Sequence, residues 1–478
     1  MTLYELLEGI EYKGNIFNQE VKSISHNSRK IPGDSLFVCI KGRNFDGHDA
    51  AMDAVGKGVV AVVCDRDLGI RNQIIVPNTR TAYAKLCENF FGDPSKKMNI
   101  IGVTGSKGKS TITYLIKNIL TGMNHKCGLI GTIQNEFCDR VYESHNSTPD
   151  AFELQSLFAD MAESGCKYCA MEVSSFALDQ NRVGNTRFSI AVFTNLKREH
   201  LDYHENMESY YNAKKLLFSQ ADLAVINIDD EYGRRLCSEI DCKVVTYSVA
   251  DSTADYYASN IKYTLTGSEF NLVAGEISGK VRFAMPGEFS VSNAVAGAAV
   301  CAEMGGGFAK ITSSLNNFKG VKGRCEVVPT EQNFTVICDY AHTPDSLDKV
   351  LSAFKSQSSG RVVAVFGCGG DRDKGKRPQM GAAAAKHADN LIITSDNPRT
   401  EDPGDIINDI LRGIDKTKVE YTAISDRKEA IIYAINNARS NDIIVLAGKG
   451  HEDYQETAKG RVHFDDREIA AQALKNLI

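Results

Sequence analysis

Residues 98–111 read MNIIGVTGSKGKST, an apolar run that ends in glycines, a lysine and two hydroxyls. A buried strand that stops at Gly105 and continues as a helix near Lys109 would place backbone N–H groups, a helix N-terminus and a lysine around one anion. The stretch therefore predicts a loop that binds a nucleotide phosphate. In the strict P-loop pattern the first glycine lies five positions before the second; here that position is Val103, so the loop is a variant.

A simpler interpretation of this stretch is a strand-to-helix turn that needs glycines only for its backbone. The Gly-Lys-Ser-Thr after a clear apolar strand favours the phosphate loop. Lys109 would then reach the β and γ phosphates, and Ser110 or Thr111 would help to hold Mg²⁺. The expected nucleotide contacts in the loop are Gly105, Ser106, Lys107, Gly108, Lys109, Ser110 and Thr111.

Length and composition indicate an ordinary globular protein of several domains. Domains average about 150 residues, so a chain of 478 residues suggests roughly three. The formal net charge of -6 gives no general attraction for nucleic acid or anionic membranes. Thirteen dispersed cysteines, an N-terminus without a long apolar core and the absence of a membrane-length apolar run favour a cytoplasmic protein.

The hydrophobic pattern divides the chain into three α/β segments. Residues 97–322 repeat strand and helix, which predicts a mostly parallel, doubly wound sheet with helices on both faces and ligands at the carboxyl ends of its strands. Residues 323–478 alternate in the same way and predict a second, Rossmann-like doubly wound unit. Residues 1–96 form a smaller unit with strands expected at 35–40, 59–65 and 73–77.

Polar residues follow the expected strands of the middle segment. The strand at 167–174 carries Glu172 near its end, where a carboxylate beside a phosphate loop is a good Mg²⁺ ligand; a solvated strand-end charge is the alternative. His200 follows the strand at 188–194, and the residue types leave open whether it is structural or a ligand. Lys214 lies on a helix expected at 208–218, where a lysine is ordinarily solvated.

Two further patterns concern helix and loop positions. The segment ESHNSTPDAFELQ opens a helix, with Ser147 or Thr148 as its expected cap. In the last segment four polar loops, DYAHTPDSL, GCGGDRDKGKRP, SDNPRTEDP and GKGHEDYQ, end strands and would share one crevice. Their glycines permit close backbone approach and their arginines can bind carboxylate or phosphate, so together they predict a ligand site.

Taken in order, these motifs resemble those of the Mur ligases of bacterial cell-wall synthesis. The resemblance covers nearly the whole chain and rests on TGSKGKST, MEVSS, TNLKREHLDYH, AKKLLF, GRCEV, DYAHTPDSL, GCGGDRDKGKRP, DNPR and GKGHE. It implies an ATP-dependent amide ligase of peptidoglycan synthesis, and hence a part in cell shape and division. It also implies three domains: a UDP-binding domain at 1–96, a central ATP-binding domain at 97–322 and an amino-acid-binding domain at 323–478.

The resemblance assigns roles to the residues that match the family's motifs. Lys109 and Thr111 correspond to phosphate and magnesium contacts, and Glu172 and His200 to magnesium ligands. Lys214 corresponds to a lysine that is carbamylated, which turns a cation into a carboxylate-like group able to hold a second Mg²⁺. These residues are the catalytic candidates. The expected contacts to the UDP-muramoyl peptide are Ser28, Asn146, Ser147, Thr148, Ser174 and Arg182, and the further nucleotide contacts are Asn293, Arg324, Asp339 and His342.

DNPR is the most informative motif, because in this family it accompanies meso-diaminopimelate, whereas lysine-adding members differ. Arg399 would pair with the far carboxylate of that amino acid, and Glu452 supplies the opposite charge that its ammonium needs. The implied reaction passes the γ-phosphate of ATP to the D-glutamyl carboxylate, and the amine then attacks the acyl phosphate. The expected acceptor contacts are Arg372, Asp396, Asn397, Pro398, Arg399, Gly448 and Glu452.

Four positions depart from the family's pattern. Phe176 stands where a histidine is usual, Glu199 where an aspartate precedes His200, and Lys107 where asparagine is common in the phosphate loop. Asn27 stands where the uridine-binding segment usually has aspartate. The magnesium candidates are unchanged, but the departures bear on the fine geometry and on the acceptor.

Two other functions are alternatives to the one that the resemblance implies. A related amide ligase with another acceptor, such as L-lysine, or a folylpolyglutamate synthase would share the chemistry, but DNPR and the uridine-type amino-terminal segment argue against both. A non-catalytic paralogue that binds a nucleotide sugar would not need the catalytic candidates, which are all present. We expect ATP and Mg²⁺ as cofactors and a monomer that acts on small molecules, with neither nucleic acid nor membrane as a partner.

Overall fold

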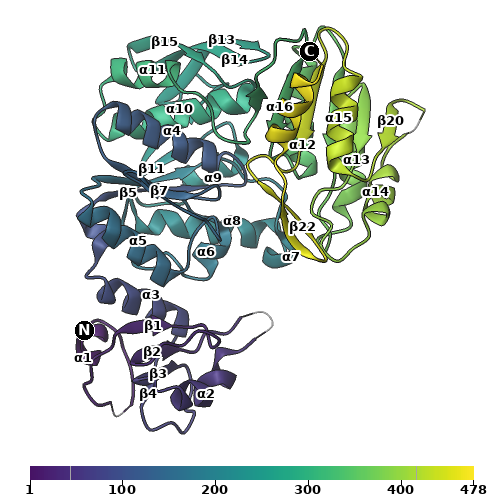
Figure 1. Cartoon of the computed structure of the whole chain (residues 1–478). Coiled ribbons are helices and arrows are strands. Elements are labelled where there is room, and N and C mark those ends of the chain that lie inside the picture. The colour runs from purple at the N-terminus through teal and green to yellow at the C-terminus, as the bar shows by residue number, and fades with distance from the viewer. Residues whose placement is uncertain (15, 43–44, 416, 478) are drawn as a thin grey trace. The chain divides into compact units, whose positions relative to one another are not determined.

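The computed structural model of the chain describes residues 1–14, 16–42, 45–415 and 417–477. These residues form two compact units, Met1–Tyr247 with Ala296–Gly306, and Ser248–Val295 with Gly307–Ile478. Parallel strands and flanking helices occur in both units (Figure 1), which confirms the predicted α/β class.

The first unit begins with a small parallel sheet in the order β1-β2-β3-β4. The strands expected in this part of the chain are confirmed. Apolar side chains of the sheet, among them Leu36 and Ile74, pack against Leu86 of α3. The elements are α1 (Leu3–Leu6), β1 (Ser23–Ser25), β2 (Ser35–Val38), η1 (Gly47–Ala50), α2 (Ala51–Gly56), β3 (Ala61–Cys64), β4 (Gln73–Ile75), α3 (Thr79–Phe90) and η2 (Pro94–Lys97).

The large sheet of the first unit runs in the order β12-β11-β10-β5-β9-β6-β7-β8. From β12 to β6 all neighbours are parallel, as predicted, while β7 and β8 form an antiparallel edge. The strands are β5 (Asn99–Thr104), β6 (Cys127–Ile130), β7 (Asn135–Phe137), β8 (Arg140–Tyr142), β9 (Tyr168–Glu172), β10 (Phe188–Phe193), β11 (Ala221–Asn227) and β12 (Lys243–Ser248).

Helices cover both faces of this sheet. Figure 1 shows α4 on one face and α5 and α8 on the other. Leu115 and Ile119 of α4 are fully buried, and Phe158 of α5 belongs to the core under the opposite face. The helices are α4 (Lys109–Gly122), α5 (Ala151–Glu163), α6 (Ser175–Asp179), α7 (Leu201–His204), α8 (Met207–Lys215), η3 (Leu216–Gln220) and α9 (Glu231–Cys237).

The predicted cap of α5 is wrong. The helix is capped by Asp150, whose carboxylate accepts hydrogen bonds from the backbone N–H groups of Phe152 and Glu153. Thr148 instead donates its hydroxyl to the Glu172 carbonyl at 2.9 Å, and Ser147 accepts a hydrogen bond from Thr132 at 2.7 Å. Both hydroxyls are committed to tertiary contacts, so the next residue able to cap takes that position.

The second unit opens with an antiparallel meander that the sequence analysis did not predict. The prediction that strand and helix alternate up to residue 322 is therefore wrong in this stretch. Three strands follow one another without a helix between them: β13 (Tyr256–Thr264), β14 (Gly267–Ala274) and β15 (Ile277–Phe283). Buried and less buried residues alternate along β13, and Gly275 has a positive φ of 56° at the second turn, so a tight hairpin replaces a crossover helix. Next come α10 (Glu288–Glu303) and α11 (Phe308–Asn316).

The remaining residues form the predicted second doubly wound sheet, in the order β16-β17-β21-β18-β19-β20. One face packs on α15 and α16, and the other on α12, α13 and α14. Only β16 is antiparallel to its neighbour. The elements are β16 (Glu326–Val328), β17 (Thr335–Asp339), α12 (Pro344–Lys355), β18 (Val362–Phe366), α13 (Lys376–His387), β19 (Asn390–Ile393), α14 (Pro403–Leu411), β20 (Glu420–Ala423), α15 (Arg427–Asn436), β21 (Ile443–Ala447), β22 (Tyr454–Thr457), β23 (Gly460–His463) and α16 (Asp466–Lys475).

Polar loops leave the carboxyl ends of β17, β18, β19 and β21, as predicted. Within the described ranges, no helix combines the length and the apolar content needed to cross a membrane.

Candidate active site

The glycine-rich loop joins β5 to α4 in the first unit. β5 ends at Thr104 and α4 begins at Lys109, so the predicted strand, loop and helix are present. Gly105 has a φ of 142°, and a Cβ built on it would overlap the hydroxyl of Thr194. Glycine is therefore required at this position both for its backbone conformation and for the close approach of β10.

Residues at the end of β10 hold the loop from the side. Thr194 donates its hydroxyl to the Lys107 carbonyl at 2.6 Å, and the Asn195 amide oxygen accepts the Lys107 N–H at 3.0 Å. The Ser106 N–H donates to the Asn195 carbonyl at 2.8 Å. The loop is thus fixed before any ligand arrives, which favours binding because less conformational entropy remains to be lost.

Two lysines converge on the loop from different helices. Lys109 donates its ammonium to the carbonyls of Gly105 and Ser106 at 2.9 and 3.1 Å. Lys214 of α8 donates to the same Gly105 carbonyl at 3.0 Å, and its Nζ lies 4.6 Å from the centroid of the Tyr210 ring. Burial and then the charge of Lys109 hold the pKa of Lys214 well below its usual range, so its neutral amine is favoured.

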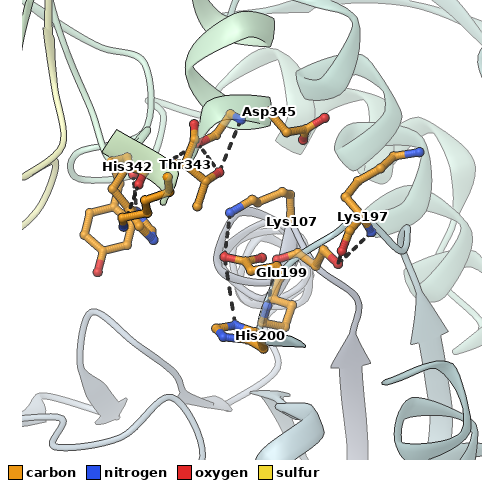
Figure 2. A network of polar contacts seen from close by, with 12 residues as sticks. Lys107, Lys197, Glu199, His200, His342, Thr343 and Asp345 are labelled. Carbon is orange, nitrogen blue, oxygen red and sulfur yellow. Dashed lines mark hydrogen bonds and ion pairs between the residues drawn. The ribbon is translucent and has the colours of Figure 1, made fainter. Parts of the chain in front are cut away.

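Glu199 links the loop to His200. Figure 2 shows the Lys107 ammonium and the His200 ring on either side of the Glu199 carboxylate, with Nζ to Oε1 at 3.0 Å and Nε2 to Oε1 at 3.9 Å. The ring of Phe176 packs edge-on against His200, with centroids 4.9 Å apart. Three of the four departures from the family pattern therefore lie together.

The charge of His200 is set by its surroundings. Burial, reinforced by the positive charge of Lys109, lowers the pKa of His200 to about 4, although Glu199 opposes the shift. The imidazole is therefore neutral near pH 7, the form in which a ring nitrogen can bind a metal ion.

Glu172, at the end of β9, is the buried carboxylate of the site. Its Oε1 accepts hydrogen bonds from the Ser110 hydroxyl at 2.7 Å and from the Thr132 N–H at 2.8 Å. Its Oε2 accepts the Thr132 hydroxyl at 3.0 Å. Of the two hydroxyls that the sequence left open, the structure places that of Ser110, not that of Thr111, against this carboxylate.

The donor set suits a hard cation. A carboxylate and a hydroxyl from the chain are the oxygen ligands that Mg²⁺ takes, with the remaining positions filled by phosphate and water. Among the described residues no group of three or more His, Cys, Asp or Glu side chains could hold a metal by itself. No hydrogen bond or ion pair between described residues joins Glu172 to His200. The candidate ligands of the chain therefore do not form a complete metal site by themselves, and phosphate oxygens of a bound nucleotide would have to supply the remaining ligands.

Most of the residues expected to bind the UDP-muramoyl peptide lie beside Glu172. The Thr148 hydroxyl accepts the Ser174 N–H at 3.0 Å, and Arg182 donates to the Thr148 carbonyl at 3.1 Å. With Ser147, which is bonded to Thr132, these residues form one polar network. Asn146 is exposed next to it. Ser28 lies apart, in the loop after β1, where its carbonyl accepts the Lys57 ammonium at 2.9 Å.

In the second unit, two of the four expected nucleotide contacts, Arg324 and His342, lie against the Tyr340 ring, together with His451. The Arg324 guanidinium lies 4.7 Å from its centroid and the rings of His342 and His451 lie 4.5 and 4.8 Å from it. Figure 2 shows His342 with Thr343 and Asp345 at the start of α12. In the part of the chain that the structure describes, no ring contact or hydrogen bond links the other two expected contacts to the Tyr340 ring. Asp339 is buried and accepts the Cys325 N–H at 2.8 Å, and Asn293 is buried on α10.

The expected acceptor contacts meet where the loops after β18, β19 and β21 approach one another. Asn397 donates its amide to Glu452 at 2.9 Å and accepts the Lys449 ammonium at 2.9 Å. Burial, and then the charge of Asp396, raise the pKa of Glu452. A Cβ on Gly448, whose φ is 116°, would lie 2.6 Å from an Asp396 carboxylate oxygen. The loops are therefore tightly interlocked.

Three further expected acceptor residues, Pro398, Arg399 and Arg372, lie in the loops after β18 and β19. Arg399 donates through Nη1 to the Gly370 carbonyl at 2.8 Å and forms an ion pair through Nε with Glu456 at 3.0 Å. The Pro398 carbonyl accepts the N–H of Glu401 at 3.1 Å, which turns the chain after this segment. Arg372 is exposed. A Cβ built on Gly369 would lie 3.0 Å from Arg399 Nη1 and 3.7 Å from Arg372 Cγ, so the structure brings Arg372 beside Arg399 with the other expected acceptor residues.

Sequence reasoning missed several residues of these sites. Thr132, Tyr210 and Lys449 each contact a predicted site residue, and Lys449 could have been noticed as a lysine two positions after a buried strand. Glu456 lies beyond the GKGHE motif on β22, and no sequence pattern marks it.

Comparison with known proteins places the chain among relatives along its whole length. Residues 103–301 match the Mur ligase middle domain, residues 323–450 the Mur ligase glutamate ligase domain, and residues 20–90 the Mur ligase family catalytic domain. A Clostridium acetobutylicum protein named UDP-N-acetylmuramoyl-L-alanyl-D-glutamate--2,6-diaminopimelate ligase 1 is 43% identical, with 100% of each chain covered. A Caldanaerobacter subterraneus protein named as such a ligase is 44% identical, with 99% of each covered.

A solved structure agrees with these relatives. It is described as UDP-N-acetylmuramoyl-L-alanyl-D-glutamate--2,6-diaminopimelate ligase, has 35% sequence identity and a TM-score of 0.71, and 96% of each chain is covered.

Proposed function

Because this chain belongs to the Mur ligase family, we propose that it is an ATP-dependent amide ligase that adds meso-diaminopimelate to UDP-N-acetylmuramoyl-L-alanyl-D-glutamate in peptidoglycan synthesis. The observation that carries the proposal is the interlocked DNPR site, in which Arg399 and Glu452 offer opposite charges. An amino acid with a distal ammonium and a distal carboxylate needs both. Full-length relatives named for this reaction support it.

Each segment has its own task in this proposal. Residues 1–96 bind the uridine diphosphate end of the substrate, residues 97–322 bind ATP, and residues 323–478 bind the amino acid. The three act within one monomer in the cytoplasm, on small molecules only. Ser28 contacts the UDP moiety, while the network of Ser147, Thr148, Ser174 and Arg182, with Asn146, holds the muramoyl peptide.

The phosphate loop prepares the first step. Its N–H groups and Lys109 bind the β and γ phosphates. Arg324, Asp339, His342 and Asn293 are the further residues proposed to contact the nucleotide. Ser110 or Thr111, Glu172 and His200 would hold Mg²⁺, which would neutralise phosphate charge when bound. A carboxylate oxygen of the D-glutamyl residue forms a bond to the γ-phosphorus, the bond to the ADP oxygen breaks, and ADP leaves.

The second step forms the amide. The amine of meso-diaminopimelate, held by Arg399, Asn397 and Glu452, attacks the acyl carbon. A C–N bond forms, the C–O bond to phosphate breaks, inorganic phosphate leaves and the amine loses a proton to water. Positioning of the two substrates supplies most of the acceleration in such a reaction.

Carbamylation of Lys214 belongs to the same proposal. The buried, neutral-favoured amine can attack CO₂, forming an N–C bond and releasing one proton. The product carries a negative carboxylate-like group next to the loop, able to bind a second Mg²⁺.

Isotope transfer tests the acyl phosphate directly. With both oxygens of the D-glutamyl γ-carboxylate labelled by ¹⁸O, each turnover should deliver one labelled oxygen into inorganic phosphate. Glu172→Gln should abolish this release, since it removes the buried carboxylate charge of the site. Amide product accompanied by unlabelled phosphate would overturn the acyl phosphate pathway.

A further inference from the structure

Arg399 is held from two sides by groups outside the DNPR motif. Its Nε pairs with Oε2 of Glu456 at 3.0 Å, and its Nη1 donates to the Gly370 carbonyl at 2.8 Å. About 23% of the arginine side chain and 31% of the glutamate side chain are exposed, so the pair lies at the surface of a site and not within a sealed core.

The backbone reinforces the same contact. The Arg399 N–H donates to the Glu456 carbonyl at 3.0 Å, and the Glu456 N–H donates to the Asn397 amide oxygen at 2.9 Å. Arg399 itself has a positive φ of 52°, a conformation that costs energy for a residue with a Cβ and persists where surrounding contacts fix it. β22 therefore fixes both the main chain and the side chain at this position.

These contacts leave one edge of the guanidinium for a ligand. In the described part of the chain, no hydrogen bond or ion pair goes to Nη2 of Arg399. A guanidinium presents its donors in a rigid planar fork, so fixing Nε and one Nη1 hydrogen fixes the direction of the remaining N–H groups. A carboxylate can accept two parallel hydrogen bonds from the Nη1 and Nη2 side.

We propose that Glu456 is a positioning and specificity-determining residue for the acceptor: it holds the Arg399 guanidinium so that its free edge meets the distal carboxylate of the amino acid. The inference rests on the proposed function. An unanchored arginine would lose rotamer freedom on binding, and prior fixing by Glu456 removes that cost. L-Lysine has no distal carboxylate and gains nothing from the fixed edge, so Glu456 raises discrimination between the two acceptors.

Steady-state kinetics of Glu456→Ala test the inference. We expect the KM for meso-diaminopimelate to rise about tenfold or more, with kcat and the KM values for ATP and the UDP-muramoyl dipeptide changed less than twofold. Discrimination against L-lysine should fall by a similar factor, and Glu456→Asp should restore part of the acceptor KM. Lys459→Ala, an exposed change in the β22–β23 turn, is the matched control and should behave as wild type.

A double-mutant cycle separates positioning from general damage. Because Glu456 acts through Arg399, Glu456→Ala should add little to the defect of Arg399→Ala. Additive defects, an unchanged acceptor KM, or a lower KM, as expected if Glu456 competes with the ligand for Arg399, would each overturn the inference. Wild-type protein without turnover on any acceptor would overturn the proposed function, and this inference with it.

Discussion

At the residue scale, burial determines the charge of the groups around the phosphate loop. Lys214 is buried with a lowered pKa and His200 is neutral, while Glu172 keeps three hydrogen bonds from Ser110 and Thr132. The loop, Glu172 and Lys214 could be predicted because each lies in a recognisable motif. The contact between Ser110 and Glu172 could not, since it depends on how β9 lies beside β5.

The geometry distinguishes the two adjacent hydroxyls of the loop. Ser110→Ala should raise the Mg²⁺ concentration for half-maximal activity about tenfold or more, because it removes the hydroxyl that lies 2.7 Å from Glu172. Thr111→Ala should change that concentration little. A magnesium titration of ATP turnover for both variants measures this. A large shift for Thr111→Ala alone would assign the magnesium contact to Thr111, the residue the family resemblance favours.

His451 should make the protein less stable in acid. Burial, and then the charges of Arg324 and Lys322, lower its pKa to about 3 in the folded state, compared with about 6.5 when unfolded. The unfolded chain therefore binds an extra proton below pH 6.5, so the free energy of unfolding falls as the pH drops from 6.5 towards 3.

Urea unfolding of His451→Phe between pH 8 and pH 4 measures this effect. The variant keeps a ring against Tyr340 but cannot take up the proton, so its stability should depend less steeply on pH than that of wild type below 6.5. Parallel pH profiles for the two proteins would contradict the assignment.

At the element scale, period and composition placed the parallel strands but not the cap of α5 or the meander. β5, β9, β10 and β21 are continuous apolar runs, which is the pattern of strands buried on both faces. The cap of α5 and the β13–β15 meander depend on tertiary contacts and on turns, which a strand-helix alternation does not reveal.

Asp150, the cap of α5, also contacts helix α3 and the residue that follows β1 of the small N-terminal sheet. Asp150 accepts the Tyr83 hydroxyl at 3.4 Å and lies 3.7 Å from His26, besides capping its own helix. Asp150→Ala should lower the free energy of unfolding of the transition that includes α5 by about 1 kcal/mol or somewhat more, and Asp150→Asn should largely retain the cap. Chemical denaturation of both variants measures this, and equal stability of Asp150→Ala and wild type would contradict the capping role.

At the scale of the whole molecule, the proposed function depends on two sites: the phosphate loop, which selects ATP, and the acceptor loops, which select the amino acid. The order of motifs made the α/β fold and the ligase chemistry predictable from the sequence. What the sequence could not provide is the contact geometry of the acceptor loops, because Arg399, Asn397 and Glu456 meet only after β19 and the β22 hairpin have packed.

The most direct test of the account supplies purified protein with ATP, Mg²⁺ and UDP-N-acetylmuramoyl-L-alanyl-D-glutamate, and offers meso-diaminopimelate or L-lysine in parallel. Phosphate release and the mass of the product are measured. We expect a ligated product with meso-diaminopimelate and little or none with L-lysine. Turnover with L-lysine alone would contradict the assignment of Arg399 and Glu452, and absence of turnover with both would contradict the ligase itself.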